Sequence, residues 1–406
     1  MQKFEKHSPV VVTEVTTKHE LRQFMQYPNR LYADNPNYIP SFYGDDLSDW
    51  TPGKNPAFDY CEARCWLARR DGEIVGRIGA ILSHKANDKF GTHRMRFSQV
   101  DFVDDSEVSA ALFGTVERWA REKGCDQVHG PLGFTDMDRE GMLVEGFDRR
   151  SLFFTNYNAP YYLEHLTRLG YRKDVDWIEY RITVPEPGGA EAERLHKLSE
   201  FILKRKHLHV ATVHHKSEYG PFVRQVFELV NAAYAPLYGV VELSDEQIER
   251  YANKFIPLVD PDFVCFVVDE QDQLVAFGVT ALDPSVALKH SDGRLFPFGW
   301  AGVLNDLHHS DTLIMLLTAV RPDLQTEGIN AVMMDHVCQS CNRHGVRFAE
   351  TGPMLELNDH ILAQWKRLKK EQHKRRRCFI KDLDHDVNAA NAAAAQTETP
   401  ETESAE

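Results

Sequence analysis

The sequence predicts an α/β (α+β) protein of two similar domains, each with a mixed, mostly antiparallel twisted sheet flanked by helices. Three observations support this prediction. The chain has 406 residues, of which 42% are hydrophobic, which is too much for one typical domain and suits two. The succession hairpin, strand, helix, strand occurs twice. In both copies the last strand closes on Gly-Pro.

The first copy begins with two apolar runs around Asp71-Gly72 (residues 65–82), a hairpin signal. A strand at 96–103 follows, and then a helical pattern at 107–124 that ends on glycine, as helices often do. The next strand ends at Gly130-Pro131.

The second copy repeats this order, with a hairpin at 263–282, a strand at 313–320, a helix at 328–345 and a strand ending at Gly352-Pro353. Because the order of the elements, their spacing and the Gly and Gly-Pro residues that end them agree, we predict a tandem duplication. The expected domains are 1–185 and 190–385, separated by the turn-rich PEPGGA, and a helix at 191–206 opens the second domain. Residues 386–406 are acidic, lack aromatics and are expected to be disordered.

Composition excludes several classes of protein. A net charge of −14 and a pI near 5.8 disfavour nucleic-acid binding. No secretory signal and no run of 18 apolar residues is present. Seven cysteines suit free thiols in a reducing cytoplasm, where we expect the protein. The pairs Cys61/Cys65 and Cys338/Cys341 are interpreted as buried structural residues, and no metal site is predicted.

The stretch from 313 to 345 carries the clearest chemical signal. An apolar strand is stopped by Pro322, a short polar turn contains Gln325 and Gly328, and a helix follows. The first N–H groups of a helix have no partner within the helix, and its N-terminus carries about half a positive charge. Such a strand–turn–helix arrangement is suited to holding phosphate.

This stretch resembles the pyrophosphate loop of the GNAT (GCN5-related) acyl-CoA N-acyltransferases, V-x-P-x-x-(Q/R)-x-x-G-x-(G/A). Val320, Pro322, Gln325 and Gly328 match that pattern, whereas Asn330 stands where the family usually has Gly or Ala. The resemblance implies acetyl-CoA or a longer acyl-CoA as co-substrate, bound by Ala319, Val320, Gln325, Thr326, Glu327, Gly328, Ile329, Asn330 and Ala331.

The first copy has Asp104-Asp105-Ser106-Glu107 in place of this loop. Three acidic groups would repel a pyrophosphate, and their expected role is to cap the following helix. The first copy is therefore predicted to be degenerate, either shaping the acceptor site or only bracing the second copy.

A wider resemblance covers residues 10 to 383 and links the chain to a poorly characterised group of bacterial tandem GNAT proteins, some of whose relatives are ceramide synthases. It is carried by segments 31–58, 130–147 and 156–162. The aromatics of segment 31–58 can line a substrate groove or pin a long connection, and the sequence leaves both open.

Amide formation from a thioester needs a neutral amine, a polarised carbonyl and a proton for the thiol. A carboxylate can deprotonate the amine, and the candidates are Glu350 and Glu356. In such folds a backbone N–H at a strand bulge polarises the carbonyl, which here indicates residues 318–320.

The family's usual tyrosine, which protonates the thiol, follows an asparagine. Asn358 is present, but Trp365 stands near the tyrosine position. The first copy keeps Tyr161, Tyr162 and Tyr171. Either a tyrosine crosses the domain interface, or the thiol takes its proton from solvent.

The leading hypothesis is an acyl-CoA-dependent N-acyltransferase acting on a primary amine. Two alternatives stay open: a long-chain transferase acting on a sphingoid or other lipid amine, and a non-catalytic CoA-binding or regulatory module. The basic run WKRLKKEQHKRRRCFIK, which includes Lys366 and ends at Lys381, is a solvated helix face, a contact for the CoA phosphates, or a contact for anionic membrane that would place the protein at the inner membrane face.

Overall fold

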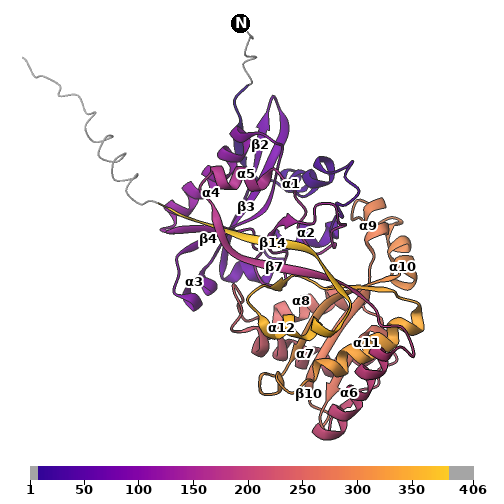
Figure 1. The fold of residues 1–406 in the computed structure, drawn as a ribbon. Coiled ribbons are helices and arrows are strands. Elements are labelled where there is room, and N and C mark those ends of the chain that lie inside the picture. The colour runs from indigo at the N-terminus through magenta and orange to yellow at the C-terminus, as the bar shows by residue number, and fades with distance from the viewer. Residues whose placement is uncertain (1–7, 384–406) are drawn as a thin grey trace, which may run out of the picture.

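The computed structural model describes residues 8–383, so the predicted tail at 386–406 lies outside the described residues. Figure 1 shows two lobes joined by two long strands that run through the middle of the molecule. The first half contains β1 (Val11–Glu14), α1 (Lys18–Leu31), α2 (Tyr43–Asp49), β2 (Cys61–Arg70), β3 (Glu73–Ser83), α3 (His84–Phe90), β4 (Arg94–Phe102), α4 (Ser106–Glu122), β5 (Gln127–Gly130), β6 (Met142–Glu145), α5 (Tyr162–Arg168) and β7 (Arg172–Thr183).

The second half repeats much of this order and adds helices. It contains α6 (Ala190–Lys206), β8 (His209–Val210), α7 (Gly220–Tyr234), α8 (Asp245–Phe255), β9 (Val264–Val268), β10 (Leu274–Leu282), α9 (Ser285–His290), α10 (Gly299–His309), β11 (Thr312–Val320), α11 (Asn330–His344), β12 (Phe348–Glu350), β13 (Met354–Leu355), α12 (Asp359–Ala363) and β14 (Lys370–Asp382).

All strands belong to one sheet, in the order β1-β2-β3-β4-β5-β14-β7-β12-β11-β10-β9-β8, with β6 on β14 and β13 on β7. The two halves exchange their last strands. β14 of the second half pairs with β5 (Phe379 opposite Gly130), and β7 of the first half pairs with β12 (Ile182 opposite Ala349). The expected boundary at 185–190 falls in the loop after β7, yet each half is completed by a strand of the other.

In the second half, side chains alternate between the two faces of the sheet, as strand geometry requires. Val264, Phe266 and Val268 pack with α7 and α8, while Cys265 and Val267 pack with α6 and α11. The turn and the helix N-terminus of interest therefore lie on the α11 face, and α7 and α8 cover the opposite face.

The local turn chemistry follows the sequence. Asp71 and Gly72 both have positive φ, 53° and 84°, as a tight hairpin requires. Gly345 ends α11 in the left-handed conformation, with φ of 71°. All seven cysteines are free and buried, and the two pairs Cys61/Cys65 and Cys338/Cys341 are among them, as predicted.

The aromatic side chains of segment 31–58 mostly pack into the first half. Tyr32, Tyr38, Phe42 and Trp50 are buried. Trp50 packs against Phe24 and Phe134, and Tyr32 against Tyr38 and Tyr157. This favours the interpretation that these side chains pin a long connection.

Candidate functional site

The turn between β11 and α11 presents free backbone donors. Pro322 ends the strand and starts a short 3-10 turn, and Gly328 adopts a φ of 79°. Within residues 8–383, no intramolecular acceptor is present for the N–H groups of Thr326, Gly328, Ile329 and Asn330. The turn is exposed from Gln325 to Gly328, so the N–H groups of Thr326 and Gly328 and the positive helix end are available to an anion.

Side chains around the turn support it without blocking it. Gln325 donates its amide to the carbonyl of Val320 at 3.3 Å. Lys206 at the end of α6 lies 2.6 Å from Glu327, whose pKa it holds below the ordinary value. Asn330 does not plug the turn; it lines a cavity alongside Thr318 and Met333.

Beside this turn the sheet opens. β11 pairs with β12 only from Thr312 to Ile314, and beyond Ile314 the two strands separate. On its other edge β11 carries a bulge: Val279 faces Leu317 and Thr280 faces Met315, so Leu316 is the extra residue. The predicted bulge is present, but it lies at Leu316 rather than at residues 318–320.

The separation of the strands opens into an apolar cavity of about 180 Å³. It runs along α11 from Asn330 to Cys341, a helical span of about 17 Å at 1.5 Å per residue. Its lining is mostly aliphatic, sulfur-containing or aromatic: Ile182, Leu195, Met315, Leu316, Leu317, Met333, Met334, Val337, Cys338, Ile361, Trp365 and Leu368. The strand exchange contributes to it, because Ile182 belongs to β7.

None of the three residues predicted to be catalytic lines this cavity. Ala349 and Thr351 face it, so the alternation along β12 turns Glu350 to the opposite face, where it lies 3.3 Å from Lys374. Glu356 pairs with Lys173 and Arg375. Asn358 caps α12 by accepting the N–H of Ile361 at 3.2 Å.

The basic run at 365–381 is largely not a solvated face, although Lys366, Arg367 and Lys369 at its start are exposed. Most of it forms β14, a central strand in which Lys374 and Arg376 are fully buried. Arg376 contacts Glu179, and Lys374 lies 3.4 Å from the same carboxylate. Burial opposes the charge of Glu179, but these cations outweigh it and hold the pKa of Glu179 below its ordinary value.

Trp365 and the tyrosines of the first copy do not supply an acid to the cavity. Trp365 lines the cavity but donates its ring N–H to the sulfur of Met354. Tyr162 is buried in the first half and bonds Tyr32 and the N–H of Phe102. Sequence reasoning missed Tyr234, at the end of α7, which lines the cavity and donates to the carbonyl of Thr318 at 2.7 Å.

At the matching position in the first half, the chain's own side chains cap the helix N-terminus. Asp105 caps α4 by accepting the N–H of Glu107 at 2.8 Å. Arg70 forms ion pairs with the carboxylates of Asp105 and Glu107. The N-terminus of α4 is therefore already occupied by the chain's own anionic groups.

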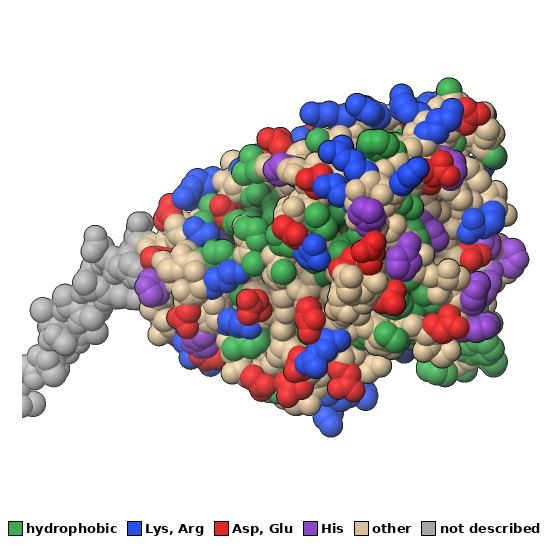
Figure 2. Space-filling model, turned by 90° about the horizontal axis from the view of Figure 1, so that it is seen from below, with side chains coloured by type: hydrophobic (Ala, Val, Ile, Leu, Met, Phe, Trp, Pro, Cys, Tyr) green, Lys and Arg blue, Asp and Glu red, His purple; other side chains and the backbone are tan. Residues whose placement is uncertain are grey.

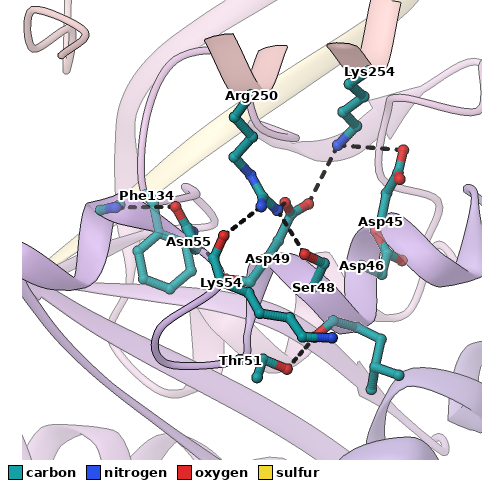
Figure 3. Close-up of polar contacts among 12 residues, drawn as sticks. Asp45, Asp46, Ser48, Asp49, Thr51, Lys54, Asn55, Phe134, Arg250 and Lys254 are labelled. Atoms are coloured by element: carbon teal, nitrogen blue, oxygen red, sulfur yellow. Dashed lines mark hydrogen bonds and ion pairs between the residues drawn. The ribbon is translucent and has the colours of Figure 1, made fainter. Parts of the chain in front are cut away.

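The two halves also meet at a polar contact between α8 and α2. Figure 3 shows α8 reaching toward α2: Arg250 lies 2.5 Å from Asp49, and Lys254 lies 3.3 Å from Asp49 and 3.7 Å from Asp45. On the first-half side, the loop from Gly133 to Glu140 lies beside this contact, since Asp138 and Lys254 line one small pocket.

One further group of potential metal ligands occurs among the described residues: His129, Asp174 and Cys378. The hydroxyl of Tyr238 hydrogen-bonds all three, at 2.9, 2.5 and 3.5 Å. The group is therefore satisfied by a phenol.

These features, a doubled sheet with exchanged strands, a splayed β11–β12 pair and an exposed strand–turn–helix, define the tandem GNAT fold. A tandem GNAT protein from the clavulanic acid biosynthesis pathway superimposes with a TM-score of 0.52 at 14% identity, over 92% of this chain and 99% of that chain. A GCN5-related N-acetyltransferase from Sphaerobacter thermophilus gives 0.50 at 12% identity, over 92% and 96%.

Two curated proteins are similar in sequence. Protein YghO of Escherichia coli K12 is 27% identical over 379 residues, which is 92% of this chain and 95% of that protein. The bacterial ceramide synthase of Caulobacter vibrioides is 28% identical over 300 residues, 72% and 75% of the two chains. No family model matches the chain. Among the described residues, no helix combines the length and apolarity needed to cross a bilayer.

Proposed function

We propose that the protein is an N-acyltransferase that moves an acyl group from coenzyme A to an amine. The single observation that carries this proposal is the exposed turn at Gln325–Gly328, whose free N–H groups lie at the mouth of the β11–β12 opening. In this proposal the turn and the α11 N-terminus bind the CoA pyrophosphate. The thioester lies in the opening, and a cytoplasmic location gives access to acyl-CoA.

In this proposal the chain positions the thioester and polarises its carbonyl group. A backbone N–H of the bulged strand at Leu316 is the candidate donor to the thioester oxygen, because beyond Ile314 the edge of β11 that faces β12 has no strand partner. A donor fixed in an apolar cleft acts in a low effective dielectric and needs no reorganisation as negative charge develops.

The cavity favours a long acyl chain as a second, finer candidate. Its apolar lining continues past the opening to Trp365 and Leu368, where a two-carbon acetyl group would leave most of that surface without a contact. The similarity to a bacterial ceramide synthase points the same way and favours a lipid amine as acceptor.

A lipid acceptor would require access to a lipid surface, and the exposed aromatic side chains between β10 and β11 support this segment as a candidate contact. Phe296 and Phe298 are 81% and 80% exposed, with Trp300 and Leu304 close by. Figure 2 shows hydrophobic side chains gathered beside histidines at the end of the molecule opposite the grey tail, the side on which α9 and α10 lie in Figure 1. Exposed Phe and Trp side chains are typical of helices that lie in a membrane interface.

Calorimetry with palmitoyl-CoA and acetyl-CoA tests the proposal, using Gly328→Glu and the matched control Gly345→Glu. Both glycines have positive φ and flank α11, but only Gly328 lies at the turn. We expect tight palmitoyl-CoA binding, lost in Gly328→Glu and kept in Gly345→Glu. No binding of either thioester by the native chain would end the proposal. Binding without turnover on an amine panel would leave the CoA-binding module.

A further inference from the structure

The loop from Gly133 to Glu140 belongs to the first half but is fixed by both halves. Arg96 of β4 donates to the carbonyl of Gly133 at 2.8 Å, and Arg139 lies 2.7 Å from Asp46 of α2. From the second half, Tyr251 of α8 shares a 2.7 Å hydrogen bond with Thr135. The loop is therefore held rigidly against α8, as a site that must position a reactant requires.

The middle of this loop reaches the strand that is proposed to hold the thioester. Met137 lines an apolar pocket together with Leu316 and Leu317, the residues of the β11 bulge. It packs in the same hydrophobic cluster as Tyr234, whose hydroxyl bonds the carbonyl of Thr318. The first half therefore covers the face of β11 that lies opposite α11.

Two carboxylates near Met137, those of Asp136 and Glu140, make no hydrogen bond or ion pair with another side chain among the described residues. The Oδ1 atom of Asp136 is buried and accepts no hydrogen bond from any described residue. Glu140 takes part in no hydrogen bond or ion pair within residues 8–383 of the structure. By contrast, Asp138 between them accepts the N–H groups of Phe134 at 2.8 Å and Thr135 at 3.1 Å, which gives it a structural role.

The surroundings make both groups weak acids. Burial, reinforced by Asp138, raises the pKa of Asp136 to about 6, although a backbone hydrogen bond opposes the shift. Burial and the neighbouring Asp136 hold the pKa of Glu140 well above its ordinary value, while Arg96 acts against it. The other charged or titratable groups near these two acids are Lys89, the phenol of Tyr234 and the thiol of Cys378.

We propose that Asp136 and Glu140 form the binding and deprotonation site for the primary ammonium of the acceptor, so that the first half supplies the acid–base groups for a thioester held by the second. This inference rests on the proposed function and deepens it. Neighbouring carboxylates that no side-chain donor satisfies are suited to bind a cation, since an ammonium supplies the missing hydrogen-bond donors and charge.

The reaction balances with these groups. The ammonium gives one proton to Asp136, and the resulting amine attacks the thioester carbonyl to form the C–N bond. The C–S bond then breaks, the amine's second proton goes to the departing thiolate, and Asp136 returns its proton to water. A base with a pKa near the working pH is the most efficient for such a transfer. Tyr234 is a positioning residue here, since burial raises the pKa of its phenol and keeps it protonated.

The test uses the full chain with Asp136→Asn and Glu140→Gln, and Asp148→Asn as a control, because Asp148 has an 83% exposed side chain. We expect palmitoyl-CoA binding by calorimetry to be unchanged in all three variants. With a long-chain primary amine such as dodecylamine or sphinganine, kcat/KM should fall about 100- to 10,000-fold in Asp136→Asn. In the native chain, kcat/KM should fall below about pH 6, and this acid limb should disappear in Asp136→Asn. Asp136→Glu should restore part of the rate.

Binding of dodecylamine to the CoA-loaded protein provides a readout that needs no turnover. The native chain should bind dodecylamine but not dodecanol, and Asp136→Asn/Glu140→Gln should lose that preference. Unchanged rates, an unchanged acid limb and unchanged amine binding in these variants would overturn the inference while leaving acyl-CoA binding intact. Failure of the native chain to bind acyl-CoA would instead remove the proposed function itself.

Discussion

At the scale of single residues, the partly buried carboxyl groups proposed to bind the amine, Asp136 and Glu140, lower the stability of the fold. An acid with a raised folded-state pKa makes the folded state bind more protons, so its contribution to stability falls as pH rises from its unfolded pKa through its folded one. For Asp136 that window runs from 3.8 to about 6. Asp136→Asn should therefore raise the free energy of unfolding above pH 6, by up to about 3 kcal/mol, while it lowers activity.

Urea unfolding at pH 5 and pH 8 measures this effect. The gain of the variant over the native chain should be larger at pH 8, and a loss of stability at both values would assign Asp136 a structural role. A lack of any difference between the two pH values would show that the carboxyl is not titrating in the folded protein over that range.

Glu179 is the opposite case among buried acids. It is fully buried beside Arg376 and Lys374, which hold its pKa below the ordinary value despite desolvation. Its contribution to stability is present above its unfolded pKa and is lost as pH falls through the lower folded pKa.

Arg376→Met leaves the Glu179 carboxylate poorly compensated and should cost about 3–5 kcal/mol of unfolding free energy. In Glu179→Leu/Arg376→Met the loss should be much smaller, as judged by urea midpoints at pH 7.

At the scale of elements, the sequence was sufficient where local chemistry decides the structure. The hairpin turn at Asp71-Gly72, the glycine stop of α11 and the strand–turn–helix around Pro322 and Gly328 all follow from φ restrictions and unpaired N–H groups. The side on which Glu350 points was not predictable, because a shift of one residue in strand phase moves a side chain to the other face.

The elements that were missed depend on partners far away in sequence. β14 contains Lys374 and Arg376, a composition typical of a solvated segment. It becomes a central strand only because Glu179, Asp176 and Glu350 supply the compensating charge. The carboxylates at Asp136 and Glu140 were also missed, since nothing local shows that their loop faces β11.

The length of the cavity along α11 makes an element-scale prediction. Val337 lies about two turns from Asn330 and faces the cavity. Val337→Phe should fill its far part, lowering affinity for palmitoyl-CoA by about tenfold or more while acetyl-CoA binding stays the same. Calorimetry with both thioesters measures this, and equal losses for the two would show that the acyl chain does not follow α11.

At the scale of the whole molecule, the strand exchange makes the two halves mutually dependent. Without β14, β5 and β7 each lose a strand partner, and Glu179 of β7 loses both buried cations. We therefore expect residues 1–189 and 190–383, expressed separately, to remain largely unfolded. Co-expressed fragments should form a stable complex, because the cut lies in the exposed loop after β7 and breaks no strand pairing.

The intact chain should unfold in a single urea transition, with the near-UV and far-UV circular dichroism signals coinciding. A protease site inserted at Gly188 is the control: the cleaved protein should stay associated in size-exclusion chromatography and keep its palmitoyl-CoA binding. Cooperative folding of the isolated 1–189 fragment would contradict this coupling, because its sheet would then be complete without the strand that the second half supplies.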